Sequence, residues 1–389
     1  MSRIFAAVFF LFLSSSFYFC SFPLLSSDSS NLYTTYEKYF YVGVALSKTD
    51  TADDIVMQSV LENFNSMTHE FAMKWSQVET SPGVYDFSYM DDFAGIANKN
   101  NFRLIGHTLV WHKANPSWLF TDRVMNDDMA RDFYLEVMRK HIATMVARYR
   151  GKVHGWDVVN EAFYYDGNFR PSPWLNLIGK DYIEKAFEFA HQADPDVELY
   201  YNDYGLVDKS KQDAVVEMIQ RLQEKGVPIH GVGIQGHYSL TYPDLERLDN
   251  AIARFSELGL KVMITELDVS VLPFPGPEER GEDAEINPAR VQELNPYSEG
   301  LPDEAMQQLT DRYVDLFCIF LKHRDAVSRV TFWGVTDARS WRNDWPVKGR
   351  TDHPLLYDRN MQPKPVVPAL VDLATNYQET CAHLWTEKE

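Results

Sequence analysis

The sequence has few cysteines and no cofactor motif. Only three of its 389 residues are cysteine, and it contains no Cys-x-x-Cys pair, no clustered Cys/His spacing and no Gly-x-Gly-x-x-Gly loop. Metal sites and dinucleotide-binding sites commonly carry such spacings. We therefore expect neither a metal nor a cofactor.

Positive charge is also scarce. The chain has 37 Lys and Arg against 56 Asp and Glu, which gives a formal net charge of −19. Nucleic acids need a basic protein face, and anionic membrane surfaces attract one. The charge balance argues against both as ligands, and nothing in the sequence implies a protein partner.

The N-terminus has the pattern of a targeting segment. Arg3 precedes the ten-residue apolar run Ile4–Leu13, which has signal-peptide length and is short for a membrane span. We expect residues 1–30 to be a signal peptide with a short polar linker, and residues 31–389 to form the main domain of an exported protein. The alternatives are an uncleaved membrane anchor and lipidation of Cys20, which the bulky residue before that cysteine disfavours.

Cleavage beyond Cys20 would leave two cysteines, Cys318 and Cys381. Cys318 lies in a helical pattern, and two cysteines do not make a disulfide framework. The sequence therefore predicts no such framework.

After residue 30, short apolar runs alternate with longer amphipathic ones, eight times over. The runs that predict strands are 41–46, 64–67, 103–110, 153–159, 197–201, 231–235, 261–267 and 329–335. Apolar residues at three- and four-residue spacing predict helices between them, including 135–149, 208–225 and 306–320. Strands that alternate with helices form a parallel sheet, and eight such units close into a barrel. No linker divides the chain, so we expect an α/β protein with a single (β/α)8 TIM barrel.

Polar and aromatic residues follow these apolar runs at their C-terminal ends, where barrel enzymes have their active sites. They are Glu70, His107, Glu161, Asn202, Asp203, Gln235, His237, Glu266 and Trp333. The two glutamates that end the runs 156–161 and 262–266 are the most informative. A buried carboxylate is costly unless it is hydrogen-bonded or used, and a pair of carboxyl groups is the minimum equipment for hydrolysing a glycosidic bond.

One connection is unusually long. Residues 272–303 follow the strand that ends at Glu266 and are rich in Pro, Gly, Asp and Glu. Long segments of this kind are usually functional or disordered. We expect this one to form a wall of the substrate-binding cleft.

Seven motifs in register closely resemble glycoside hydrolase family 10, the endo-β-1,4-xylanases. They are Thr68–Trp75, Gly106–His112, Trp156–Glu161, Tyr201–Tyr204, Gly233–His237, Ile264–Asp268, and Phe332–Asp337 with Ser340–Arg342. The resemblance runs from about residue 40 to 375. It implies a secreted, retaining endo-β-1,4-xylanase that acts on xylan and xylo-oligosaccharides by double displacement.

The resemblance also implies roles for individual residues. Glu161 would be the general acid/base and Glu266 the nucleophile, and a retaining mechanism requires these carboxyl groups to lie about 5–5.5 Å apart. His237 would bridge Glu266 and Asp268 and so orient the nucleophile. The residues implied to bind substrate are Glu70, Lys74, His107, Trp111, Asn160, Asn202, Tyr204, Gln235, Trp333 and Trp341.

Within this set, Asn160 resembles the donor to the sugar 2-hydroxyl, and Tyr204 would line the first aglycone subsite. Without the resemblance, His237 would be read as a buried core histidine and Trp111 as core packing. His112 is expected to be structural.

The sequence departs from the family pattern at two positions on the glycone side. Phe71 stands where the family usually has Asn, and Ala114 stands where it often has Gln. Both changes remove hydrogen-bonding groups. The Phe71 ring would either face the second sugar upstream of the cleaved bond or point into the core.

Three other functions remain open from the sequence. One is a related retaining β-glycosidase that prefers short or aryl xylosides or a glucan. Another is a catalytically inactive glycan-binding barrel, which release of reducing ends from xylan would exclude. The third is a metal-dependent hydrolase that uses His107, His112, His237 and Asp268, which full activity after exhaustive chelation would exclude.

Overall fold

The computed structural model describes residues 31–120, 127–275 and 288–385. The predicted targeting segment and the middle of the long connection, residues 276–287, lie outside these ranges. Among the described helices, none combines the length and the apolar character needed to cross a bilayer.

Eight parallel strands form a closed barrel, which confirms the predicted fold. The strands are β1 (Tyr41–Leu46), β2 (Ser66–His69), β5 (Arg103–Trp111), β6 (Val153–Asn160), β7 (Glu198–Asp203), β8 (Gly231–Ile234), β10 (Lys261–Ser270) and β11 (Val327–Phe332). Closure is made by β11, which pairs with both β10 and β1. Each predicted strand is present, with ends displaced by three residues or fewer.

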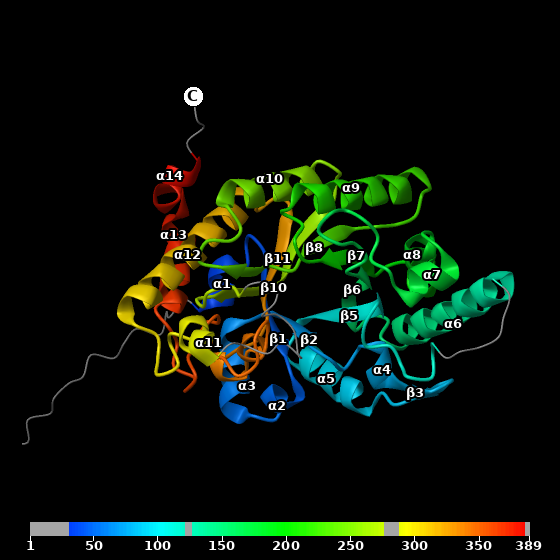
Figure 1. Cartoon of the computed structure of the whole chain (residues 1–389), viewed down its shortest axis with the longest axis horizontal. Helices are drawn as coiled ribbons and strands as arrows, with labels where there is room; N and C mark the ends of the chain where they lie inside the picture. The colour runs from blue at the N-terminus through cyan, green and yellow to red at the C-terminus, as the bar shows by residue number, and fades with distance from the viewer. Residues whose placement is uncertain (1–30, 121–126, 276–287, 386–389) are drawn as a thin grey trace, which may run out of the picture. The chain divides into compact units, whose positions relative to one another are not determined.

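Helices surround the strands, as Figure 1 shows. The longer ones are α3 (Asp54–Asn63), α5 (Ser88–Lys99), α6 (Asp127–Arg148), α8 (Tyr182–Ala193), α9 (Lys209–Glu224), α10 (Leu245–Ser256), α12 (Asp303–Lys322) and α13 (Val366–Thr380). The shorter elements are α1 (Leu32–Tyr36), α2 (Lys48–Thr51), α4 (Trp75–Val78), α7 (Pro173–Ile178), α11 (Pro288–Leu294), α14 (Ala382–Trp385), η2 (Asp337–Arg339) and η3 (Trp341–Asn343). A β3–β4 hairpin (Glu79–Ser81, Val84–Tyr85) and the short strand β9 (His237–Ser239), which pairs with β10, complete the fold.

Two glycines allow large aromatic side chains into the barrel. Gly106 on β5 is in register with Trp156 on β6, and a Cβ at Gly106 would lie 2.0 Å from the indole. A Cβ at Gly155 would lie 2.3 Å from the ring of Tyr200 on β7. Both aromatic side chains are buried. Since such interiors are close-packed, these glycines make room for them.

The two ends of the described domain meet. The Tyr36 hydroxyl of α1 donates a hydrogen bond to the Leu370 carbonyl of α13 at 2.7 Å. Tyr36 also packs against Phe40 and Phe317, with ring centroids 5.1 and 5.2 Å apart. Helix α1 therefore lies beside the N-terminal end of β1, opposite the strand ends that carry the predicted site.

A disulfide bond joins Cys318 of α12 to Cys381, directly after α13. The sequence did not predict this bond, because nothing in a separation of 63 residues shows that α12 and α13 pack together. The bond fastens the C-terminal end of α13 to α12.

The described part of the long connection is not featureless. It contains α11 and is tied to the segment after η3: Asn295 Oδ1 accepts from the Thr351 amide at 2.8 Å, and the Tyr297 carbonyl lies 3.2 Å from His353 Nε2. Its assignment as a cleft wall stays a prediction.

Candidate active site

The predicted site residues come from different strands and gather at the C-terminal ends of the barrel. Glu161 directly follows β6, and Glu266 lies within β10. The described structure therefore brings together side chains that are far apart in the sequence, as expected for a barrel enzyme.

Two residues hold both glutamates. Asn202 donates its side-chain amide to Glu266 Oε1 at 2.9 Å, and its carbonyl accepts from the Glu161 amide at 2.9 Å. Gln235 binds the same two glutamates with the roles exchanged. Its side-chain amide donates to Glu161 Oε1 at 3.0 Å, and its backbone carbonyl accepts from the Glu266 backbone amide at 2.6 Å. Asn202 and Gln235 thus fix the positions of the two carboxyl groups relative to each other.

Glu266 is buried but is held in its ionised form. Burial alone would raise its pKa, yet the hydrogen bond from His237, the nearby His107 and the amide of Asn202 lower the pKa below the ordinary value. His237 Nε2 lies 3.1 Å from Glu266 Oε2. An ionised carboxylate in this position is equipped to act as a nucleophile.

His237 lies between two carboxylates. Its Nδ1 is 2.9 Å from Asp268 Oδ2. Burial alone would lower the pKa of His237, but the charge of Asp268 and the hydrogen bonds to Asp268 and Glu266 raise it to about 9. The imidazole is therefore protonated at neutral pH and donates to both carboxylates, which fixes the rotamer of Glu266.

Asp268 is fully buried and has three partners. It accepts from His237, from Trp341 Nε1 at 2.8 Å and from the Arg342 guanidinium at 2.8 Å. Burial alone would raise the pKa of Asp268, but Arg342 and His237 lower it. This network explains how a carboxylate with no exposure stays ionised behind the histidine.

Glu161 has an unusual backbone conformation. Its φ of +56° lies in the left-handed region, which costs a non-glycine residue roughly 1–3 kcal/mol and is common at functional sites. Its Oε2 accepts from Trp111 Nε1 at 3.1 Å, beside the Gln235 bond to Oε1. Trp111 is thus a partner of the carboxyl group and does not belong only to the core.

The residues predicted to bind the glycone sugars form a second group. Lys74 is buried, with its Nζ 4.6 Å from the Phe71 ring centroid and 4.8 Å from that of Trp111. Burial lowers the pKa of Lys74, against the opposing effect of nearby carboxylates that include Glu266. Burial, followed by the charge of Asp50, raises the pKa of Glu70 to about 7.

The side chain of Phe71 is 54% exposed. The alternative that placed this ring in the core is therefore wrong. Ala114 has a φ of +51°, and its carbonyl accepts from the Ser76 amide at 2.9 Å. Both departures from the motif pattern lie in the segments that flank Lys74.

His107 and Asn160 lie deeper in the site. His107 is buried, with its Nδ1 2.9 Å from Asp157 Oδ2 and its ring 5.5 Å from that of Trp333. The peptide that follows His107 is cis. The side-chain amides of Asn160 and Asn202 lie 2.9 Å apart. Asn202, which also donates to Glu266, thus links the Asn160 side chain to that carboxylate.

The chain matches the family model described as Glycosyl hydrolase family 10 over residues 31–373. The chain belongs to glycosyl hydrolase family 10. It is 42% identical over 341 residues to "Endo-1,4-beta-xylanase A" of Xylanibacter ruminicola, which covers 86% of this chain and 91% of that protein. Xylanase B of Clostridium stercorarium superposes with a TM-score of 0.80 at 34% identity over 88% of this chain and 99% of that chain. A mutant solved in complex with xylotriose superposes with a TM-score of 0.78 at 34% identity, and the match covers 88% of this chain and 100% of that chain.

In this family 10 chain, Tyr204 contacts Arg170 and Lys211, which are not among the predicted site residues. Its hydroxyl accepts from the Arg170 guanidinium, whose Nε also donates to the Glu161 carbonyl at 3.1 Å. Lys211 Nζ lies 3.5 Å from the Tyr204 ring centroid and forms a buried ion pair with Asp203 at 2.6 Å. Burial raises the pKa of Asp203 to about 6 against the effect of Lys211.

Some of these partners could have been found in the sequence. Arg342 lies in the motif Ser340–Arg342, in which the resemblance assigns no role to the arginine. Arg170 and Lys211 lie in no motif that we recognised, so only the folded chain brings them to the site. Burial lowers the pKa of His112 to about 4, so this ring is neutral at pH 7, and its structural role stays a prediction.

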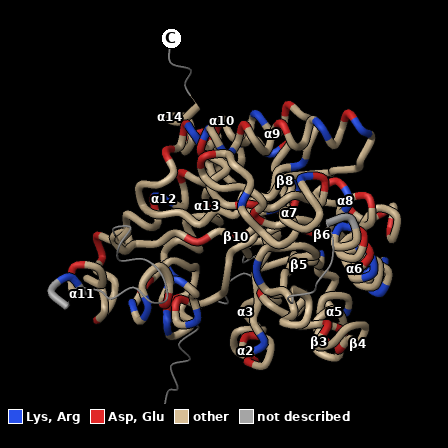
Figure 2. Tube along the Cα trace, turned by 45° about the vertical axis from the view of Figure 1, so that its right-hand side comes forward, with Lys and Arg blue, Asp and Glu red and all other residues tan. Residues whose placement is uncertain are grey.

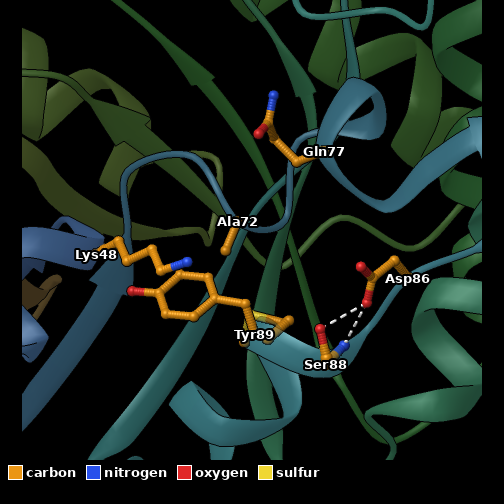
Figure 3. A pocket seen from close by; sticks show the side chains of 7 residues that line it. Lys48, Ala72, Gln77, Asp86, Ser88 and Tyr89 are labelled. Carbon is orange, nitrogen blue, oxygen red and sulfur yellow. Dashed lines mark hydrogen bonds between the residues drawn. The ribbon is translucent and has the colours of Figure 1, made fainter.

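The described residues contain no group of three or more His, Cys, Asp and Glu side chains placed to hold a metal ion. His107 and His237 instead contact carboxylates. Figure 3 shows a surface pocket lined by Lys48, Ala72, Gln77, Asp86, Ser88, Tyr89 and Met90. None of the predicted site residues lines it, so this family 10 site is built from the strand ends and not from that pocket.

Proposed function

We propose that this family 10 protein is a retaining endo-β-1,4-xylanase, with Glu161 as acid/base and Glu266 as nucleophile. The observation that carries the proposal is the reciprocal bonding of both glutamates by Asn202 and Gln235. Retaining glycosidases need two carboxyl groups in a fixed relation across the scissile bond.

In the first step, the Glu266 carboxylate attacks the anomeric carbon and Glu161 donates its proton to the leaving oxygen. The glycosidic C–O bond breaks, an ester to Glu266 forms, and the aglycone leaves with the proton. His237 keeps Glu266 ionised for attack, since its charge and hydrogen bond favour the carboxylate.

In the second step, the Glu161 carboxylate takes a proton from water, which attacks the anomeric carbon and displaces Glu266. The sugar is released with its configuration retained, and both carboxyl groups return to their initial protonation states. Asn160 and His107, next to Glu266, are proposed to bind the sugar hydroxyls.

The proposal of xylan as substrate is supported by the names of the relatives, which are endo-1,4-β-xylanases, and by the structural relative solved with xylotriose. The decisive assay is a product profile on arabinoxylan, glucuronoxylan, linear xylo-oligosaccharides and β-glucan. Internal cleavage of xylan supports the proposal, whereas activity on aryl xylosides or β-glucan alone would favour the related β-glycosidase.

The nucleophile is tested by Glu266→Ala. This variant should lose turnover on xylan while keeping its fold, and azide should restore part of the activity on activated aryl xylosides with an inverted glycosyl azide as product. Wild-type hydrolysis rates in the variant would remove Glu266 from the mechanism.

The acid/base is tested by Glu161→Ala. Xylan cleavage should fall about 10²–10⁴-fold, because its leaving group needs protonation. Aryl xylosides with good leaving groups should keep their first step and stall at deglycosylation, which gives a burst. A uniform loss on both substrate types without a burst would contradict the role.

We also propose that the protein is exported. The run Ile4–Leu13 supports this, as does the Cys318–Cys381 bond, since disulfides persist mainly in oxidising compartments. Fractionation of cells that express the full chain tests the proposal, and recovery of the protein only from the cytoplasm would contradict it.

A further inference from the structure

Three aromatic rings form a row that starts at the buried carboxylate Asp268. Trp341 donates its indole N–H to Asp268 at 2.8 Å. The Trp345 ring stacks on Trp341 at 4.9 Å and 23°, and the Phe274 ring lies 6.1 Å beyond Trp345. We call Trp341, Trp345 and Phe274 the aromatic row.

The outer two rings of the row are exposed. Trp345 is 39% exposed and Phe274 is 56% exposed, although both are large apolar side chains. Contiguous exposed apolar surface commonly marks a binding site. Since Trp341 is among the predicted substrate-binding residues, the row continues that surface outward.

The segments that carry the outer rings are fastened to each other. The buried Arg350 guanidinium donates to the Pro273 carbonyl at 3.0 Å and to the Trp345 carbonyl at 3.4 Å. Its amide donates to the Asn343 carbonyl at 2.8 Å. One side chain thus holds the residue before Phe274 against Trp345, so the two rings are presented as a fixed platform.

A second cation connects the platform to the catalytic network. The Arg342 guanidinium lies 5.6 Å from the Trp345 ring and pairs with Asp268 at 2.8 Å. The row is therefore continuous with the group that orients His237 and Glu266. This continuity favours a further part of the substrate as its occupant over a separate partner protein.

We propose that Trp345 and Phe274 form an additional subsite, which binds a pyranose ring of the polysaccharide beyond the sugars next to the cleaved bond. The apolar C–H face of a xylose ring would lie against the exposed aromatic surface, where rigid rings bury area at low entropic cost. This inference rests on the proposed function, because it takes xylan as the ligand.

Calorimetric titration of Glu266→Ala protein with xylotriose and xylohexaose tests the subsite, with and without Phe274→Ala. Removal of the ring should weaken xylohexaose binding about tenfold, since burying half of such a ring is worth roughly 1.4 kcal/mol. Xylotriose binding should change by about twofold or less on the same scale. Phe274→Tyr should keep the long-chain affinity.

Tyr41→Ala is the matched control. Tyr41 is 42% exposed and begins β1, at the opposite end of the barrel from the site. Its removal should leave both affinities unchanged. An equal loss for both ligands in Phe274→Ala, or no loss for either, would overturn the subsite.

Trp345→Ala separates the subsite from simple support of Trp341. If Trp345 belongs to a subsite, the Trp345→Ala variant should have a higher KM on long substrates and an unchanged kcat. If Trp345 only supports Trp341, the variant should also have a lower kcat on aryl xylosides. The second result would overturn the proposal. Failure of the wild-type protein to release reducing ends from xylan would instead reject the proposed function, which is a separate result.

Discussion

At the residue scale, Phe71 stands in the first motif where the family pattern usually has Asn. Its exposed ring lies against the Lys74 ammonium, and a cation over an exposed aromatic ring contributes about 0.5–1 kcal/mol. The ring therefore takes the place of a hydrogen-bonding side chain next to Lys74, which is predicted to bind substrate.

We expect Phe71→Asn to bind xylotriose and xylobiosides more tightly, because an amide can pair with a sugar hydroxyl that the ring leaves unpaired. The melting temperature should change little, since the ring is exposed. Calorimetric titration and thermal unfolding measure the two effects. Phe71→Ala serves as the control, and weaker binding by the Asn variant than by wild type would show that the ring itself binds sugar.

His237 gives the site a defined pH dependence. Its pKa is raised to about 9 in the folded protein, against about 6.5 when unfolded. Its contribution to stability is therefore fully present below pH 6.5 and is lost as the pH rises through about 9.

We expect the melting temperature of the wild type to fall between pH 6.5 and 10 by more than that of His237→Asn, which has no titrating group there. Differential scanning calorimetry over this range measures the difference. Parallel profiles for the two proteins would show that His237 is not held in its protonated form.

Much of the site could be expected from the sequence, because its residues follow strands that periodicity reveals. Glu161 and Glu266 are examples, and the structure places His237 between Glu266 and Asp268. The conformation of Glu161 and the approach of Arg170 to its carbonyl could not be read, because they depend on how separate segments pack.

At the scale of elements, the eight barrel strands were predictable because each is a short buried run between helices. The disulfide, the β3–β4 hairpin and β9 were not predictable. The strands β3, β4 and β9 have only two or three residues each, which is too short for a periodic signal. The disulfide depends on the packing of α12 against α13, which the sequence does not reveal.

The disulfide should stabilise the protein by about 2–4 kcal/mol, mainly because it closes a loop between cysteines that are 63 positions apart. We expect a lower melting temperature in wild type under reducing conditions, and in the double variant Cys318→Ala with Cys381→Ala. Reductant should have no effect on that variant, which makes it the control. A wild-type melting temperature that does not change when reductant is added would contradict the prediction.

At the scale of the whole molecule, we expect the charge of −19 to slow the association of anionic xylans. Figure 2 shows acidic and basic residues interspersed along α6 and α9, but the sum is strongly negative. Xylan that carries uronic acids is also anionic, so association should be slowed by repulsion at low salt.

We expect kcat/KM on glucuronoxylan to rise several-fold between about 0.01 and 0.1 M salt, where the screening length falls from roughly 30 to 10 Å. Neutral arabinoxylan measured in parallel is the control and should respond little. An equal response of both substrates would show that net charge does not govern encounter.

The meeting of α1 with α13 has a consequence for how the enzyme can be tethered. Because Tyr36 bonds to Leu370 beside the N-terminal end of β1, the described domain starts at the pole opposite Glu161 and Glu266. A tag or domain fused before Asn31 would therefore be attached at the end of the barrel opposite the two glutamates. An enzyme immobilised through this end would turn its carboxylates toward the surrounding medium, where an insoluble polymer could reach them without passing the support.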